Sequence, residues 1–163
     1  MNRKLRMILS GAGIAALFLP VPALEAQHHA PPSDSAFRRV QERGQSVMGV
    51  DQYTSRHIFA PLPDGGSITL TREVDDSAGA AQIREHMRQI AAQFEAGNFT
   101  APFLVHAQQV PGTSVMSARR RHIVYSVTDV PRGATLFLRT SDSAALAAIH
   151  EFLAFQRSDH RAH

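Results

Sequence analysis

The sequence predicts an α+β domain in which an antiparallel sheet of at least four strands carries two helices on one face. Two pairs of β-rich segments, each pair joined by a glycine-containing turn, indicate two hairpins. Each hairpin is followed by an Asp/Ser cluster that can cap a helix, and then by apolar residues at three- and four-residue spacing. We therefore interpret the chain as a pseudo-repeated ββα-ββα unit.

The first 26 residues have the features of a secretory signal peptide. Arg3, Lys4 and Arg6 precede an apolar run over residues 8–19, which is shorter than the roughly 20 residues of a membrane span. Signal peptidase could cut after Ala23 or after Ala26, and the second site removes the whole apolar stretch; an uncleaved anchor is the alternative. We expect a periplasmic or secreted protein with no integral membrane segment after cleavage.

Composition limits what the exported protein can be. Of the 163 residues 26 would be removed and 137 would remain, which is enough for a single domain. The 17 basic and 14 acidic residues would become 14 and 13, so the net charge would fall from +3 to +1 and no general attraction to nucleic acid is expected. Because the chain has no cysteine, neither a disulfide nor a lipoprotein anchor can form.

The N-terminal half begins with a leader and a hairpin. Residues 27–46 mix charge with few apolar side chains, which predicts a flexible leader with one or two helical turns over 37–42. The single α+β domain is expected over 47–158, and 159–163 is expected to be a C-terminal tail. Strands over 57–62 and 67–73 flank the turn sequence Pro-Asp-Gly-Gly, which is the clearest hairpin signal in the chain.

The remaining elements follow in order. The Asp-Asp-Ser sequence at 75–77 predicts an N-cap for a helix that ends at Gly97. We interpret residues 100–106 as a short strand or extended segment and 109–117 as a loop. The second hairpin is expected to have strands over 122–128 and 134–140, and a second helix is expected to start after residues 141–143.

Histidines are the main candidates for a functional site. The chain has nine, and those at 28, 29, 160 and 163 lie near the ends. On the two predicted helices, His86 and His150 share a face with apolar residues, and a structural histidine bonded to a carbonyl or carboxylate is the simpler interpretation of each. Their matching places in the two halves nevertheless favour convergence. The candidate metal ligands are His57, His86, His106, His150 and Met116.

The metal that these residues would suit depends on their partners. Imidazoles converging with Met48, Met87 or Met116 would suit copper, whereas imidazoles with Asp51 or Glu85 would suit zinc. The loop over residues 48–52 has no periodicity that explains its polar groups, and functional residues are common in such loops. Met48, Asp51 and Gln52 are therefore candidate ligand-binding residues.

Several familiar chemistries have no motif here. The chain lacks an HExxH zinc motif, a Gly-x-Ser-x-Gly nucleophile turn and a glycine-rich phosphate loop. Residues 119–121 are three arginines without interleaved aromatic residues, which is more typical of a solvated loop than of a nucleic-acid site.

Several segments together resemble a family of small exported bacterial proteins of uncharacterised function. The resemblance rests on residues 47–52 with His57, on the turn at 63–66, on 83–86, His106 and 111–116, and on 148–160. Val50 stands where the family commonly has phenylalanine, and Arg56 where it has a second histidine. Proteins of this appearance are sometimes labelled aspartate carbamoyltransferase, but that enzyme resembles a chain about twice this size with a Ser-Thr-Arg-Thr motif that is absent here.

Three functions are compatible with these features. The first is a periplasmic histidine-rich protein that binds a small ligand or a metal ion, copper or zinc. The alternative is a cofactor-free protein-interaction or envelope-stress module whose histidines are structural. The third is a small hydrolase-type enzyme that uses a histidine as general base. The sequence leaves the metal, the ligand and a homodimer open.

Overall fold

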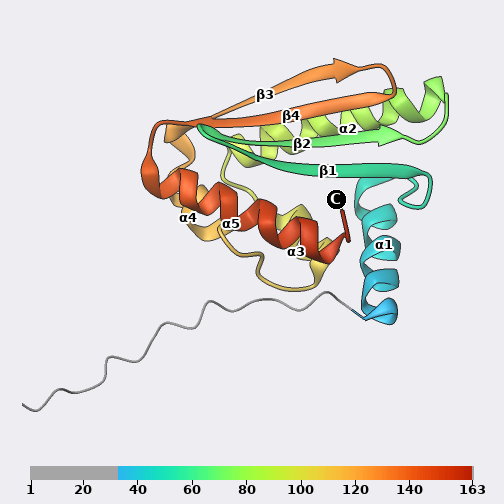
Figure 1. The fold of residues 1–163 in the computed structure, drawn as a ribbon, viewed down its shortest axis with the longest axis horizontal. Coiled ribbons are helices and arrows are strands. Elements are labelled where there is room, and N and C mark those ends of the chain that lie inside the picture. The colour runs from blue at the N-terminus through green and yellow to red at the C-terminus, as the bar shows by residue number, and fades with distance from the viewer. Residues whose placement is uncertain (1–32, 163) are drawn as a thin grey trace, which may run out of the picture.

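The computed structural model describes residues 33–162, and the predicted signal peptide lies outside them. Within this range the fold is α+β, with one four-stranded antiparallel sheet of order β1-β2-β4-β3 and five α-helices (Figure 1). The elements are α1 (Asp34–Met48), β1 (Ser55–Leu62), β2 (Gly65–Arg72), α2 (Ser77–Glu95), α3 (Thr100–His106), α4 (Thr113–Ala118), the 3-10 turn η1 (Arg120–His122), β3 (Ile123–Val130), β4 (Gly133–Thr140) and α5 (Ser143–Asp159). The predicted fold class is confirmed, while the pseudo-repeat stays a prediction.

Both predicted hairpins are present, and β2 and β4 pair at the centre of the sheet. Each of these two strands begins at a glycine. A Cβ atom at Gly65 would lie 1.8 Å from the Leu138 carbonyl oxygen, and one at Gly133 would lie 2.0 Å from the Leu70 carbonyl oxygen. Only glycine allows the two turns to approach the neighbouring strand this closely.

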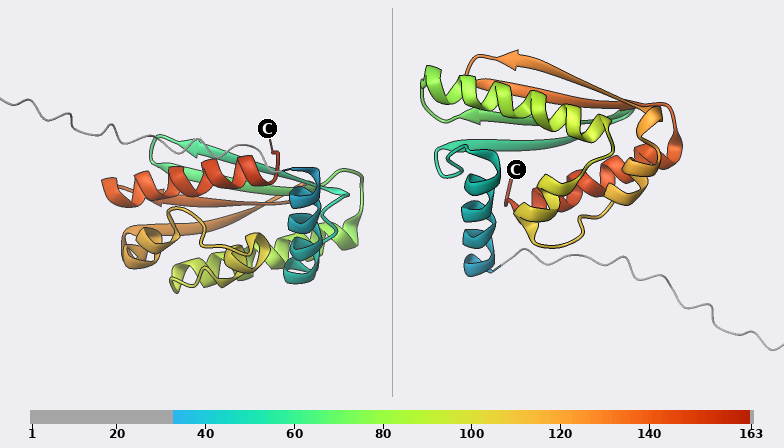
Figure 2. Two further views of the ribbon diagram at one scale, coloured as in Figure 1. Left: turned by 90° about the horizontal axis from the view of Figure 1, so that it is seen from below. Right: turned by 180° about the vertical axis from the view of Figure 1, so that it is seen from behind.

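The helices lie on one side of the sheet, as Figures 1 and 2 show. α2 packs across β3 and β4, and α5 packs mainly across β1 and β2. Alternate residues of the strands, such as Phe59, Leu70 and Leu136, point toward the helices and form the core with Ile83 of α2 and Phe152 of α5. The opposite face of the sheet carries no helix of the described chain.

Both predicted helix caps are confirmed. The Asp76 carboxylate accepts a hydrogen bond from the Gly79 N–H at 2.9 Å, and the Asp142 carboxylate accepts one from the Ala145 N–H at 2.8 Å. These bonds satisfy amides that have no partner inside the helix, which fixes where α2 and α5 begin.

Two segments differ from the prediction. Residues 100–106, expected to be extended, form helix α3, and residues 113–118, expected within a loop, form helix α4. The Asn98 side chain accepts from the Thr100 N–H, and Pro102 lies in the first turn of α3, where a missing N–H costs nothing. Helices of six or seven residues are too short to show a periodic apolar pattern, so their sequences do not predict them.

The ends of the domain also differ from the prediction. In place of one or two turns within a flexible leader, α1 spans Asp34–Met48 and packs against α3, where the Arg43 guanidinium donates to the Val105 carbonyl at 2.6 Å. In place of a C-terminal tail beginning at residue 159, α5 extends to Asp159 and the next residue, His160, is buried. Both docked ends bury polar side chains, such as Gln41 of α1 and Gln156 of α5, and residue composition alone assigns such side chains to solvent. No helix within residues 33–162 is long and apolar enough to cross a membrane.

Candidate functional site

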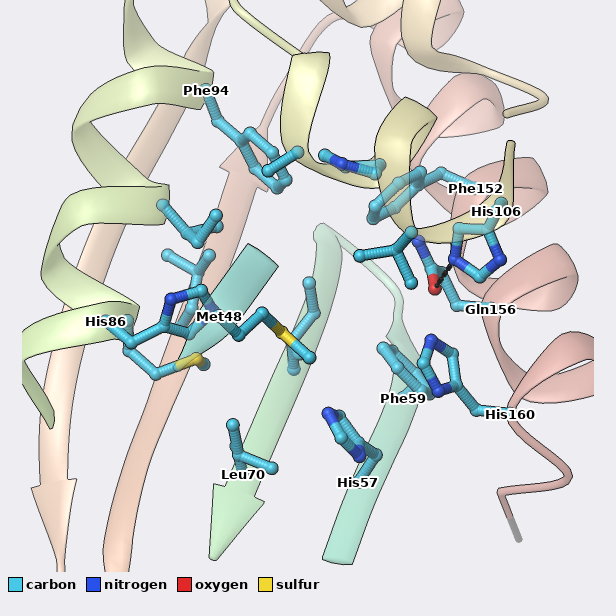
Figure 3. A pocket seen from close by; sticks show the side chains of 17 residues that line it. Met48, His57, Phe59, Leu70, His86, Phe94, His106, Phe152, Gln156 and His160 are labelled. Carbon is cyan, nitrogen blue, oxygen red and sulfur yellow. Dashed lines mark hydrogen bonds between the residues drawn. The ribbon is translucent and has the colours of Figure 1, made fainter. Parts of the chain in front are cut away.

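A pocket of about 70 Å³ lies between the helix-facing side of the sheet and helices α1, α2, α3 and α5 (Figure 3). Most of its lining is apolar, with aromatic rings from Phe59, Phe94 and Phe152. The polar side chains that reach it are His57, His86, His106, Gln156 and His160. A volume of this size holds several water molecules or a small organic group.

Two imidazoles that are far apart in the sequence stack in the wall of this pocket. The ring centroids of His57, on β1, and His160, after α5, lie 4.9 Å apart with an interplanar angle of 27°. The Phe59 ring lies 5.8 Å from His57 and 5.6 Å from His160, so the three rings form one cluster. His106 meets His160 edge-on, with 5.1 Å between ring centroids.

Three of these histidines are held in the neutral form. Burial, together with the imidazoles of His86 and His106, lowers the pKa of His57 from 6.5 to about 4. Burial lowers the pKa of His86 to about 4, and burial with two neighbouring imidazoles lowers that of His160 well below 6.5. A neutral imidazole has one donor and one acceptor nitrogen. The pocket wall therefore offers hydrogen bonds without net charge at neutral pH.

His160 has an unused polar atom. The residue is 9% exposed, and its Nδ1 is buried with no hydrogen-bond partner in the described chain. An unpaired buried polar atom costs about 1–3 kcal/mol. Such an atom beside an apolar pocket is a suitable contact for a ligand.

His106 has a structural role, because both of its ring nitrogens contact protein atoms. Its Nδ1 bonds the Asp159 carboxylate in a short contact, and its Nε2 lies 2.9 Å from the Gln156 amide oxygen. The side chain is 1% exposed, so the two bonds tie the end of α3 to the end of α5. Because both ring nitrogens are occupied, His106 has none free to act as a general base.

His150 is likewise structural. Its Nε2 donates to the carbonyl oxygens of Leu62 at 2.9 Å and Gly65 at 3.0 Å, which are the two ends of the first hairpin turn. The simpler interpretation of this histidine, a ring bonded to a carbonyl, is the one that the contacts favour.

We predict that His150→Ala lowers the free energy of unfolding by about 1–2 kcal/mol, because two partly buried carbonyls lose their donor. Urea denaturation at pH 7 measures the change. His122→Ala removes an exposed histidine and should cost less than about 0.5 kcal/mol. If the two variants are equally stable, the contact of His150 with the hairpin contributes nothing.

The predicted metal ligands are not brought together as one set. His57 and His86 line the pocket, whereas His106 and His150 bond protein atoms and Met116 is fully buried in the core. No group of three or more His, Cys, Asp or Glu side chains among residues 33–162 is arranged to hold a metal ion. The predicted His57, His86, His106, His150 and Met116 centre therefore does not fit a metal as a unit.

The predicted ligand-binding residues have different roles. Met48 lines the pocket. Asp51 closes its own loop by accepting from the Tyr53 N–H at 2.9 Å and the Thr54 hydroxyl at 2.8 Å, and these bonds lower the pKa of its carboxyl. Gln52 is buried and lines a neighbouring pocket on the other side of His57.

His160 and Gln156 are pocket residues that the sequence analysis does not predict, and His160 falls within the expected C-terminal tail. A signal was present: Ile149, Leu153, Gln156 and His160 recur at spacings of four, three and four residues, which continues the buried face of α5.

Comparison with protein-family models, with curated proteins and with solved structures finds no match for this chain. The contacts and electrostatics of the pocket are therefore the basis on which its function is assigned.

Proposed function

We propose that this protein binds a small, largely apolar ligand in the pocket between the sheet and helices α1, α2, α3 and α5. The ligand would fill the apolar space and hydrogen-bond to a neutral imidazole in the wall. Residues 1–26 have the features of a signal peptide, which supports the further proposal that binding takes place in the periplasm or outside the cell.

The observation that carries the proposal is the unpaired Nδ1 of His160 at an apolar pocket. Ligand pockets are typically apolar with a few polar atoms that fix orientation. A ligand with one hydroxyl or N–H group would supply the partner that Nδ1 lacks, while aromatic rings of the pocket would contact its apolar part. Phenol and indole have this chemistry, and because each is larger than the 70 Å³ of free space, part of the molecule would extend through the opening of the pocket.

Titration of the purified protein with phenol and with indole, followed by NMR, tests the proposal. We expect saturable binding to one site with a Kd of about 1 mM or tighter, corresponding to about −4 kcal/mol. Ala101→Phe fills the pocket from α3 and should abolish binding. Ala81→Phe adds the same side chain on the exposed face of α2 and should leave binding unchanged.

Two outcomes would contradict this proposal. Binding that survives Ala101→Phe would place the ligand elsewhere. Absence of saturable binding by either probe would favour a cofactor-free interaction module with structural histidines.

The second candidate ligand is a cuprous ion. Met48 and Met87 line the same pocket as His57 and His86. Thioether and imidazole ligands suit Cu(I). Met48→Leu preserves the volume and removes the sulfur, so it should weaken Cu(I) binding and leave phenol binding intact. Equal Cu(I) affinity in both proteins would remove this candidate.

A further inference from the structure

A second pocket adjoins the first and shares two of its side chains. It has a volume of about 290 Å³ and lies between α1, the start of β1 and the C-terminal end of the described chain. His57 and His160 line both pockets, so the stacked imidazole pair forms a common wall. We call the first the inner pocket and the second the outer pocket.

Gln52 provides a fixed acceptor in the outer pocket. Its side-chain amide nitrogen donates to the Val50 carbonyl oxygen at 2.8 Å, which sets the orientation of the amide group. The residue is 4% exposed, and its Oε1 is buried with no partner among the described residues. This oxygen is therefore a buried acceptor that faces no protein donor.

Gln41 adds a second acceptor beside it. This α1 residue is 7% exposed, lines the outer pocket, and also has an Oε1 without a partner in the described part of the chain. A Cβ atom at Gly44 would lie 3.2 Å from three atoms of the Gln52 side chain, so Gln52 packs against α1. Gly44 and Gln41 are three residues apart on this helix and share a face. The two glutamine amides consequently lie along the same wall.

The group that fits this wall is a hydrogen-bond donor. Gln41 and Gln52 present acceptor oxygens, and His160 Nδ1 is the third buried atom without a partner in this pocket. Arg56 and Glu73, which also line the pocket, have opposite charges, and Arg161 pairs with Asp34 at 2.9 Å, so the lining offers no net charge to hold an ionic ligand. A neutral group with two N–H donors, such as a primary carboxamide, meets both requirements.

We propose that the inner and outer pockets form one divided site for an amphipathic small molecule. Its apolar body occupies the inner pocket, and a neutral carboxamide-type head group donates to Gln41 and Gln52 in the outer pocket. The body and head join beside the His57–His160 pair. This inference rests on the proposed function, because it assumes that the inner pocket holds the apolar body.

A matched pair of probes tests it. Propylbenzene carries only the apolar body, whereas 3-phenylpropanamide adds the carboxamide head. We expect NMR titration of the wild-type protein to give a Kd about tenfold lower for the amide than for the hydrocarbon, as two additional hydrogen bonds with a modest net gain each would produce.

Two variants assign the preference to the outer pocket. Gln41→Leu and Gln52→Leu each remove one of the two acceptors, so each should reduce the tenfold preference to about threefold and leave the propylbenzene Kd unchanged. Gln41→Leu should also raise the urea midpoint, because an unpaired buried oxygen is replaced by apolar surface. Gln45→Leu, at an exposed position of the same helix, should alter neither quantity.

The results separate the two proposals. If neither probe binds the wild-type protein, the proposed function fails, and the divided site with it. If propylbenzene binds but the amide binds no more tightly, the inner pocket is a binding site and the divided site is wrong. A preference that persists in both glutamine variants would also overturn the assignment of the head group to this wall.

Discussion

Acidification from pH 7 to pH 4.5 is expected to destabilise the folded protein by several kcal/mol, because three imidazoles in the wall of the inner pocket are neutral in the folded state. The pKa values of His57 and His86 are lowered from 6.5 to about 4, and that of His160 is also lowered. Between pH 6.5 and pH 4 the unfolded chain therefore binds protons that the folded chain does not. Stability must fall as the pH falls through this window.

The size of the effect follows from the shifts. One pKa unit corresponds to about 1.4 kcal/mol, so His57 and His86 each contribute a loss of about 2–3 kcal/mol at pH 4.5. A domain of this size is typically stable by about 5–15 kcal/mol, so the loss is a large fraction of the total. The stacked rings of His57 and His160 would repel each other if both were charged, so the first protonation makes the second less favourable.

Urea denaturation at pH 7.5, 6.5, 5.5 and 4.5 measures this dependence. His57→Phe keeps a ring in the cluster but cannot bind a proton, so it should flatten the slope by up to about 1.4 kcal/mol per pH unit. His122→Ala, which removes an exposed histidine, should keep the wild-type slope. A constant free energy of unfolding between pH 7.5 and pH 5.5, or equal slopes for wild type and His57→Phe, would contradict the neutral cluster.

Most of the fold is predictable from the sequence because its signals are local. The hairpin turns need glycine at Gly65 and Gly133, and the carboxylates of Asp76 and Asp142 cap the two long helices. Such signals act within a few residues, so they are visible without tertiary information. Helix α1 is mostly polar, and its few apolar residues, such as Val40, do not by themselves predict a helix of this length. It is also held by contacts such as Arg43 with Val105, from a segment 62 residues away.

The site is less predictable because the contacts that form it are tertiary rather than local. His86 belongs to an apolar helix face, so its inward orientation follows from periodicity. The sequence cannot show whether an inward histidine already has a protein partner: His150 finds two carbonyls and His106 finds Asp159 and Gln156, whereas His160 Nδ1 finds none. These differences arise from strand register and from the docking of α3 on α5, both of which are tertiary.

Loss of the Asp159 carboxylate should cause the second largest decrease in the free energy of unfolding. In Asp159→Ala the buried His106 ring loses the partner of its Nδ1, and removing one member of a buried pair costs about 3 kcal/mol. Asp159→Asn keeps an oxygen acceptor at the same place and should cost about 1 kcal/mol. Urea denaturation at pH 7 measures both variants.

An exposed ion pair provides the matched control. Asp129 lies 2.7 Å from Arg88 and 3.6 Å from Arg84, and its side chain is about half exposed, so Asp129→Ala should cost about 1 kcal/mol or less. If Asp159→Ala costs no more than Asp129→Ala, the His106 contacts do not hold α3 to α5. If it costs about 3 kcal/mol while the asparagine variant stays close to wild type, the neutral hydrogen bond provides most of the stabilisation. In that case α3, which supplies Ala101, Pro102 and Val105 to the inner pocket, is anchored from its last residue.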